Sequence, residues 1–140
     1  MYDKPTIIDG SSFVDDRGIL SFCNTFNFEG VKRFYQVQNH AVNYIRAWHG
    51  HEREAKYVYV VSGSALVGAV NMKTEEINKF VLSSQTPKIL FVPEGYANGF
   101  KTLAENTVLM FFSTSSLEES KGDDIRYDYD HWNIWKEDYR

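Results

Sequence analysis

The chain has 140 residues, the length of one domain, and a single cysteine, Cys23, which excludes an intrachain disulfide. Its formal net charge of −4 creates no overall positive field that would attract nucleic acid or an anionic membrane, so an anion would need a local site. No basic segment followed by an apolar run opens the chain, and no apolar stretch reaches membrane-spanning length. We therefore expect a single domain over residues 1–140 in the cytoplasm, with no nucleic acid or membrane partner.

Short apolar or alternating runs separated by turn residues follow one another along the chain, and aromatic residues make up 16% of it. Both features favour β-strands. Asp15-Asp16-Arg17-Gly18 predicts a turn, and Ser62-Gly63-Ser64 predicts a hairpin between the runs on either side of it. We expect strands at residues 19–22, 31–38, 44–51, 56–61, 65–71, 76–82, 89–92, 97–103 and 107–114.

The end of the chain differs from the rest. Residues 115–121 favour a short helical turn that ends at Gly122, and an aromatic tail with Asp residues follows over 123–135. Large apolar side chains are costly to leave in water, so we expect this tail to pack against the domain or a second subunit. Eight or more short strands with such a tail predict an all-β sandwich or small barrel.

Two histidines one residue apart lie in the strand expected at 44–51. Side chains alternate along a strand, so His49 and His51 share one face, while Trp48 and Gly50 share the other. If the histidine face lines the interior of a barrel, the two imidazoles form either a metal site or an acid/base pair.

The pattern around the two histidines is similar to the metal motif of cupin barrels, which continues with a glutamate and with a further histidine after Pro-x-Gly. Here Lys56 replaces the glutamate, and Asn98, after Pro93-Glu94-Gly95, replaces the last histidine. A protonated amine cannot coordinate a divalent cation, and an amide is a poor replacement for imidazole. We therefore expect no metal and no other cofactor; Glu52 or Glu54 is left open as a replacement carboxylate.

The same residues suit proton transfer next to a ketone, which needs a base near neutral pH and a group that stabilises the enolate oxygen. Histidine suits the first role and lysine the second. A carboxylate commonly holds such an imidazole in one tautomer, and Asp128 and Asp130 are candidates. The candidates for holding a phosphate, or for stacking on a base or sugar, are Arg17, Arg46, Lys32, Arg33, Phe22, Phe26, Tyr35 and Trp48.

Several segments together resemble the dTDP-4-dehydrorhamnose 3,5-epimerases, and the resemblance extends over about residues 13–135. The segments are 15–18, 46–49, 55–58, 61–64, 93–100 and 124–128. The resemblance implies an all-β cupin jelly-roll barrel that forms a homodimer, uses no metal or cofactor and binds a dTDP-linked sugar nucleotide.

The resemblance also implies roles for individual residues. His49 corresponds to the base, and Lys56 corresponds to the group that stabilises the enolate. Arg17 and Arg46 correspond to the arginines that hold the diphosphate.

Three positions depart from the family pattern. A tail aspartate pairs with the base in the family, but Tyr129 occupies the nearest matching position, so we expect Asp128 or Asp130 to serve. Asn98 stands where the family has a histidine. Phe111 stands where the family has the tyrosine that protonates the opposite face of the sugar, and a phenyl ring donates no proton.

A sister group, the dTDP-4-oxo-6-deoxyglucose 3,4-ketoisomerases, is similar in other respects. Those enzymes have about this length, a His-x-His strand and a run similar to Lys32-Arg33-Phe34-Tyr35, and they lack the acid tyrosine. In such an enzyme, His49 and His51 would share the proton transfer between neighbouring carbons and oxygens.

We therefore expect a metal-free isomerase of deoxysugar or surface polysaccharide biosynthesis that deprotonates C3 of a dTDP-4-oxo-6-deoxyhexose. The expected outcome is epimerisation at C3, or at C3 and C5, with 3,4-ketoisomerisation as the alternative. Arg33, Tyr35 and Asn98 are expected to help bind the substrate. Hypotheses of other classes are a non-catalytic cupin that binds sugar nucleotides and a metal-dependent cupin oxygenase.

Overall fold

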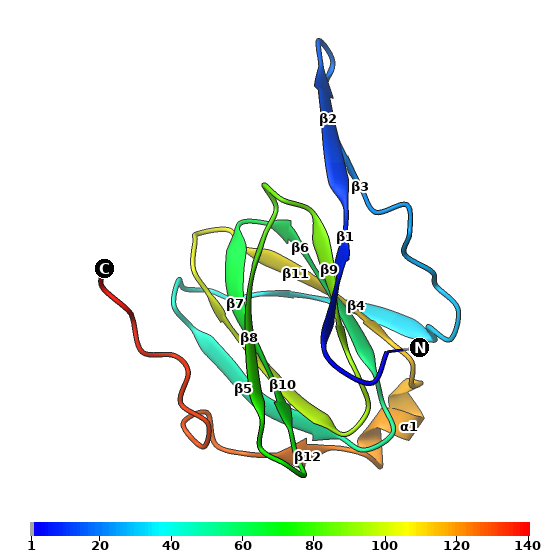
Figure 1. Cartoon of the computed structure of the whole chain (residues 1–140), viewed down its shortest axis with the longest axis vertical. Coiled ribbons are helices and arrows are strands. Elements are labelled where there is room, and N and C mark those ends of the chain that lie inside the picture. Colours follow the sequence, from blue (N-terminus) through cyan, green and yellow to red (C-terminus); the bar gives the residue numbers. More distant parts are fainter. Residues whose placement is uncertain (1) are drawn as a thin grey trace.

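A computed structural model describes residues 2–140, which form two five-stranded sheets that enclose a shared core (Figure 1). The first sheet has the order β1 (Thr6–Asp9), β9 (Lys88–Val92), β6 (Lys56–Ser62), β11 (Val108–Ser113), β4 (Arg33–Gln38). The second has the order β12 (Ile125–Arg126), β5 (Ile45–His51), β10 (Tyr96–Thr102), β7 (Ser64–Asn71), β8 (Ile77–Ser83). All pairings within these sheets are antiparallel, and the expected all-β jelly roll is confirmed.

Each strand expected from the sequence is present, with its ends displaced by a residue or two. The short strands β1, β2 (Ser11–Asp15) and β12 were not predicted, because short runs carry little periodicity of their own. The predicted helical turn is α1 (Leu117–Lys121), which begins after a capping box between Ser116 and Glu119 and ends at Gly122. No helix in the described part of the chain is long and apolar enough to cross a membrane.

The turn Ser62-Gly63-Ser64 is a corner between the two sheets, and the prediction of a hairpin at this position is wrong. β6 pairs with β9 and β11, whereas β7 pairs with β10 and β8. Gly63 has a φ of +81°, and a Cβ at this position would collide with Thr107. A glycine-containing turn therefore suits this corner as well as it suits a hairpin, and its composition does not tell which sheet the next strand joins.

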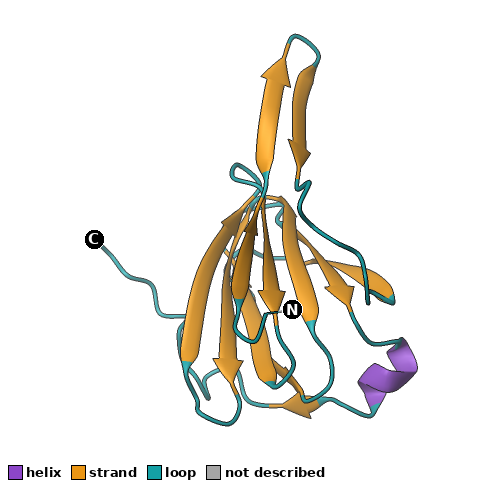
Figure 2. Cartoon of the chain, turned by 45° about the vertical axis from the view of Figure 1, so that its right-hand side comes forward, coloured by secondary structure: helices purple, strands orange, loops and turns teal. Residues whose placement is uncertain are grey.

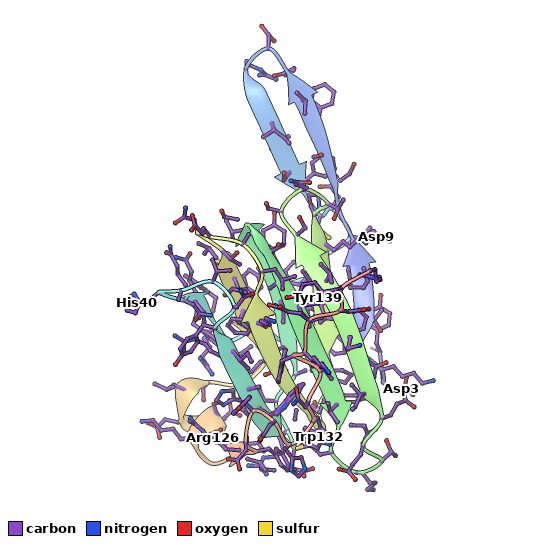
Figure 3. The ribbon with its side chains drawn as sticks, turned by 90° about the vertical axis from the view of Figure 1, so that its left-hand side faces the viewer. Asp3, Asp9, His40, Arg126, Trp132 and Tyr139 are labelled. Atoms are coloured by element: carbon purple, nitrogen blue, oxygen red, sulfur yellow. The ribbon has the colours of Figure 1, made fainter. Side chains whose placement is uncertain are left out.

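The aromatic tail (residues 127–135) covers the outer face of the second sheet, as expected. Trp48 of β5 is fully buried there against Trp132 and Trp135, with ring centroids 5.6 and 5.1 Å away. The indole nitrogens of Trp48 and Trp135 both donate to the carbonyl oxygen of Tyr129, over 3.1 and 2.8 Å. Figure 3 shows Trp132 at the same end of the molecule as Arg126 of β12.

A hairpin of β2 (Ser11–Asp15) and β3 (Gly18–Phe22) projects from the two sheets (Figures 1 and 2). Its large apolar side chains stand in solvent, with exposures of 58–69% for Phe13, Val14, Ile19 and Leu20. An isolated two-stranded hairpin is marginally stable in water, so this apolar surface is suited to contact with another molecule.

Replacement of Trp135 by alanine should destabilise the fold by about 3–5 kcal/mol, the usual cost of truncating a buried aromatic side chain. Trp135 is only 4% exposed and packs on Trp48. Urea unfolding measures the change in the free energy of unfolding. Tyr139→Ala is the control, since Tyr139 is 89% exposed and its removal should change stability by no more than about 0.5 kcal/mol. Equal stability of the two variants would contradict a docked tail.

Candidate active site

A cavity of about 360 Å³ opens between the two sheets near α1 and β12. Its lining combines groups that transfer protons with groups that bind anions. The residues predicted from the sequence that line it are His49, His51, Lys56, Arg33, Tyr35, Arg46 and Asn98. Apolar side chains from Val37, Phe100 and Phe111 continue from the cavity into the core between the sheets. The structure therefore brings most of the predicted site residues together in one place.

One side of the cavity, the histidine wall, consists of His49 and His51 of β5, Asn98 of β10, and Asp124 and Arg126 beside β5. Asn98 lies directly opposite His49 in the antiparallel pair, and Arg126 of β12 lies opposite His49 on the other side. Residues opposite each other in adjacent strands share a face of the sheet. The predicted shared face of the two histidines is confirmed, since both line the cavity while Trp48 is buried against the tail.

Arg46 reaches the cavity through an irregularity in the pairing of β5. Strict alternation would turn Arg46 away from His49, because the two residues are three positions apart. The register shifts between Asn98, which faces His49, and Phe100, which faces Arg46, so β5 contains one extra residue here. Arg46 then lines the cavity, and its Nε donates to Asn39 Oδ1 over 2.7 Å.

The facing side, the lysine wall, consists of Tyr35 of β4, Lys56 of β6 and Phe111 of β11. Phe111 and Tyr35 lie opposite each other, with parallel rings whose centroids are 5.0 Å apart. Lys56 Nζ lies 5.5 Å from the centroid of the tyrosine ring and 5.9 Å from that of the phenylalanine ring. Burial, with the charge of Glu54, raises the pKa of Tyr35, so its phenol is protonated at neutral pH and able to donate.

The lining of the cavity is strongly cationic. Five of its side chains carry a positive charge and one carries a negative charge, Asp124; the cationic residues are Arg33, Arg46, Lys56, Lys121 and Arg126. The whole chain has a net charge of −4, so this cationic lining is a local feature of the molecule. The cavity therefore supplies the local site that an anionic ligand would need.

His49 is held in its neutral form. Burial is the main cause that lowers its pKa, followed by the positive charges of Arg126 and Lys56, while Asp124 acts in the opposite direction. A neutral imidazole at pH 7 is able to accept a proton from a bound substrate.

His51 is fixed in one tautomer by the backbone. Its Nδ1 lies 2.6 Å from the carbonyl oxygen of Asp123, which accepts only, so the proton must be on Nδ1. The Asp123 carboxylate in turn accepts from the backbone N–H groups of Glu52 and Arg53. In the neutral ring Nε2 of His51 is then the acceptor atom, and within residues 2–140 it has no hydrogen-bond partner.

Asp128 and Asp130, the expected partners of His49, are exposed and do not line this cavity. Asp124 and Arg126 line it instead, joined by a 3.0 Å bond from Arg126 Nε to Asp124 Oδ2. These two residues belong to the segment 124–128 that contributed to the family resemblance, and their spacing of two is the signal that would have placed both on one face of a short strand.

Arg17 is distant from the cavity of its own chain. It lies in the turn of the projecting hairpin, where its side chain is 84% exposed and paired with Asp15. Its role in holding a diphosphate stays a prediction.

Neither candidate for a replacement metal-binding carboxylate lines the cavity. Glu52 is exposed, and Glu54 is buried beside Ser113. Within residues 2–140, no three His, Cys, Asp or Glu side chains are grouped in a way that could hold a metal ion.

A family model described as dTDP-4-dehydrorhamnose 3,5-epimerase matches residues 3–138. The chain belongs to this family. The identification from sequence segments is thereby confirmed, and the protein is a sugar-nucleotide isomerase of the epimerase and ketoisomerase type that serves deoxysugar biosynthesis.

Individual relatives support the same assignment. The spore coat polysaccharide biosynthesis protein SpsL of Bacillus subtilis is 25% identical over 105 residues, which cover 69% of this chain and 70% of that protein. The RmlC epimerase of Mycobacterium tuberculosis superposes with a TM-score of 0.75 at 20% identity, over 89% of this chain and 68% of that one. The QdtA 3,4-ketoisomerase of Thermoanaerobacterium thermosaccharolyticum superposes with a TM-score of 0.72 at 19% identity, over 93% of this chain and 91% of that one. At these identities the two structures establish the shared RmlC-like cupin fold.

Replacement of Arg126 by glutamine should raise the pKa of His49 toward its ordinary value. The reason is that the positive charge of Arg126 is, after burial, the largest cause of the low pKa. An NMR titration of the histidine ring protons measures the change. Arg140→Gln removes the same charge from an exposed residue and should leave His49 unaffected. Identical titration curves for the two variants would contradict this arrangement of the histidine wall.

Proposed function

We propose that this member of the dTDP-4-dehydrorhamnose 3,5-epimerase family epimerises C3 of a dTDP-linked 4-oxo-6-deoxyhexose. One observation carries the proposal: the neutral imidazole of His49 on the histidine wall faces a protonated phenol and an ammonium group on the lysine wall. Epimerisation needs a base on one face of the sugar and an acid on the other. The mechanism needs no metal and no other cofactor.

His49 acts as the base in this mechanism. Its neutral imidazole takes the proton from C3, and the electrons of the C3–H bond move into a C3–C4 double bond as the C4 carbonyl becomes an enolate. The ammonium group of Lys56 then lies where it stabilises the negative charge on the C4 oxygen. His51, fixed by the carbonyl oxygen of Asp123, accepts a hydrogen bond from a sugar hydroxyl through Nε2.

Tyr35 supplies the returning proton. The phenol is next to Phe111, the residue that stands where the family has its acid tyrosine, and both rings belong to the lysine wall. Donation from Tyr35 to C3 on the face opposite His49 re-forms the C4 carbonyl and inverts C3. The phenolate then regains a proton from solvent, and the imidazolium of His49 releases to solvent the proton that it took from C3.

The cationic side chains that line the cavity suit the diphosphate of the substrate. Arg46, Lys121 and Arg126 line the cavity, and guanidinium groups match phosphate oxygens in a bidentate way. The QdtA structure is described as a complex with TDP, which supports a thymidine nucleotide as the carrier here. The name of SpsL supports a product used in a surface polysaccharide.

A homodimer would bury the exposed apolar hairpin, and the hairpin of one copy would place Arg17 at the cavity of the other. Sedimentation velocity tests this expectation, since a species of 16.2 kDa alone would contradict it.

A second candidate, 3,4-ketoisomerisation, is favoured by the presence of two histidines on the same wall. His49 would take the proton from C3 and return it to C4 on the same face, while His51 Nε2 passes the hydroxyl proton from the C3 oxygen to the C4 oxygen. The product would carry its carbonyl at C3.

Incubation with dTDP-4-oxo-6-deoxyglucose in deuterium oxide, followed by NMR, tests the proposal. We expect deuterium at C3, an inverted C3, the carbonyl still at C4 and no exchange at C5. Deuterium at C4 with the carbonyl at C3 would establish the ketoisomerase instead. If the protein binds the nucleotide but exchanges no proton at C3, C4 or C5, it is a non-catalytic binding protein.

Replacement of Tyr35 by phenylalanine should separate proton removal from inversion. We expect the variant to exchange the C3 proton from the histidine face, but to form the C3 epimer about 10²–10⁴-fold more slowly, the usual contribution of a general acid. His49→Asn should lose both exchange and inversion. His40→Asn is the control, because His40 is an exposed residue outside the cavity (Figure 3). Epimer formation at the wild-type rate by Tyr35→Phe would overturn the role of Tyr35.

A further inference from the structure

Glu54 is a fully buried carboxylate beside the cavity that the mechanism above does not use. It lies in the connection between β5 and β6, and its side chain is 0% exposed. A buried carboxylate is unfavourable unless neighbouring charges and hydrogen bonds compensate for the lost water, so its contacts show what it interacts with.

Each oxygen of Glu54 has different neighbours. Oε2 accepts a 2.7 Å hydrogen bond from Ser113 Oγ and lies 3.6 Å from Arg33 Nη2 and 3.9 Å from Lys56 Nζ. Oε1 lies 3.7 Å from His51 Nδ1 and, within the described chain, has no hydrogen-bond partner. Arg33, Lys56 and His51 all line the cavity, so this carboxylate contacts groups from both of its walls.

The strand register explains why these groups meet. Ser113 of β11 lies directly between Arg33 of β4 and Lys56 of β6, and the three residues share one face of the first sheet. Glu54 lies against this row. The carboxylate is therefore held by the serine at a fixed place between two cationic side chains.

The distance to Lys56 distinguishes this contact from an ordinary buried ion pair. At 3.9 Å the amine is beyond hydrogen-bonding distance of Oε2, so its N–H donors are not used by the carboxylate. The side chain of Lys56 is only 8% exposed, and such burial disfavours the charged amine. The negative charge of Glu54 offsets that effect, while the N–H donors of the amine make no hydrogen bond to the carboxylate.

We propose that Glu54 is a positioning residue, which keeps the amine of Lys56 charged and aimed at the C4 oxygen of the substrate. This inference rests on the proposed role of Lys56 as the group that stabilises the enolate.

The charged groups around Lys56 determine how its loss of a proton depends on pH. Burial lowers the pKa of Lys56, Glu54 opposes this, Arg33 of β4 lowers it further and Asp124 raises it. Without the charge of Glu54, the pKa of Lys56 falls, and the ammonium is lost at a lower pH. The charge of Glu54 also raises the pKa of Tyr35, whose ring centroid lies 5.5 Å from Lys56 Nζ, so the basic limb of the kinetic profile reports both groups and the NMR signal of Lys56 separates them. The pKa of His49 is set by burial, Arg126, Lys56, Asp124 and His51, so the acidic limb of the activity profile should stay in place.

The kinetic test compares Glu54→Gln with Glu52→Gln. Both variants remove one negative charge, but Glu52 is exposed. For Glu54→Gln we expect the basic limb of the kcat profile to move down by about one pH unit or more, with KM within about twofold and the acidic limb unchanged. For Glu52→Gln we expect the wild-type profile. A lower kcat in Glu54→Gln with both limbs at their wild-type positions would reduce Glu54 to a structural residue and overturn the inference.

NMR of protein with ¹³C-labelled lysine measures the same effect without any reaction. The Lys56 signal is assigned by its absence in Lys56→Arg, and it should titrate at lower pH in Glu54→Gln than in the wild type. Such a shift, together with no turnover of the proposed sugar nucleotide, would refute the proposed function and retain the role of Glu54. If Glu54→Gln does not fold, Glu54→Asp, which withdraws the charge by one methylene group, should show a smaller shift. An unchanged Lys56 titration in the folded variant would overturn the inference.

Discussion

The pairing of β5 with β10 on one side and β12 on the other decides where the functional and structural residues of this protein lie. Side chains of β5 alternate between the two faces of the second sheet, so the imidazoles of His49 and His51 reach the cavity while Trp48 reaches the tail. Backbone hydrogen bonds between Trp48 and Tyr127 join the tail to the strand in both directions. The docked tail thereby also holds Asp124 and Arg126 against the histidine face, and the packing of the outer face supports the chemistry of the inner one.

The two facing walls of the cavity have different roles, which follow from burial and charge: one accepts a proton and the other donates one. On the histidine wall, burial and neighbouring cations favour the neutral imidazole, which is the form that accepts a proton. On the lysine wall, burial keeps the phenol of Tyr35 protonated at neutral pH, so the proton for C3 is present, and it also makes this phenol a weaker acid than an exposed tyrosine. A partly dry site with a proton acceptor on one side and a proton donor on the other is suited to removing a proton from one face of a sugar and adding one to the opposite face.

The all-β class could be predicted from the sequence because its strands are short and regularly spaced, whereas the cupin jelly roll was implied by the family resemblance. The shared face of His49 and His51 followed from alternation alone. Three features depended on information beyond local pattern: the corner at Gly63, the extra residue of β5 that turns Arg46 inward, and the two-residue strand that brings Arg126 to His49. Each is a matter of register between segments distant in the chain, which composition and periodicity do not encode. In the sequence, Glu54 is only a candidate metal ligand, since no sequence pattern reveals that a carboxylate lies buried among three cavity residues.

The central claim is that the sugar lies between the two walls, and a crystal structure with a non-reactive dTDP-hexose tests it most directly. The account predicts C3 of the sugar between the His49 ring and the Tyr35 hydroxyl, with the diphosphate at Arg46 or Arg126. A sugar ring placed outside this cavity, for example in the larger hollow of about 670 Å³ beside residues 38–42, would contradict it. So would a ring within the cavity whose C3 is turned away from both His49 and Tyr35.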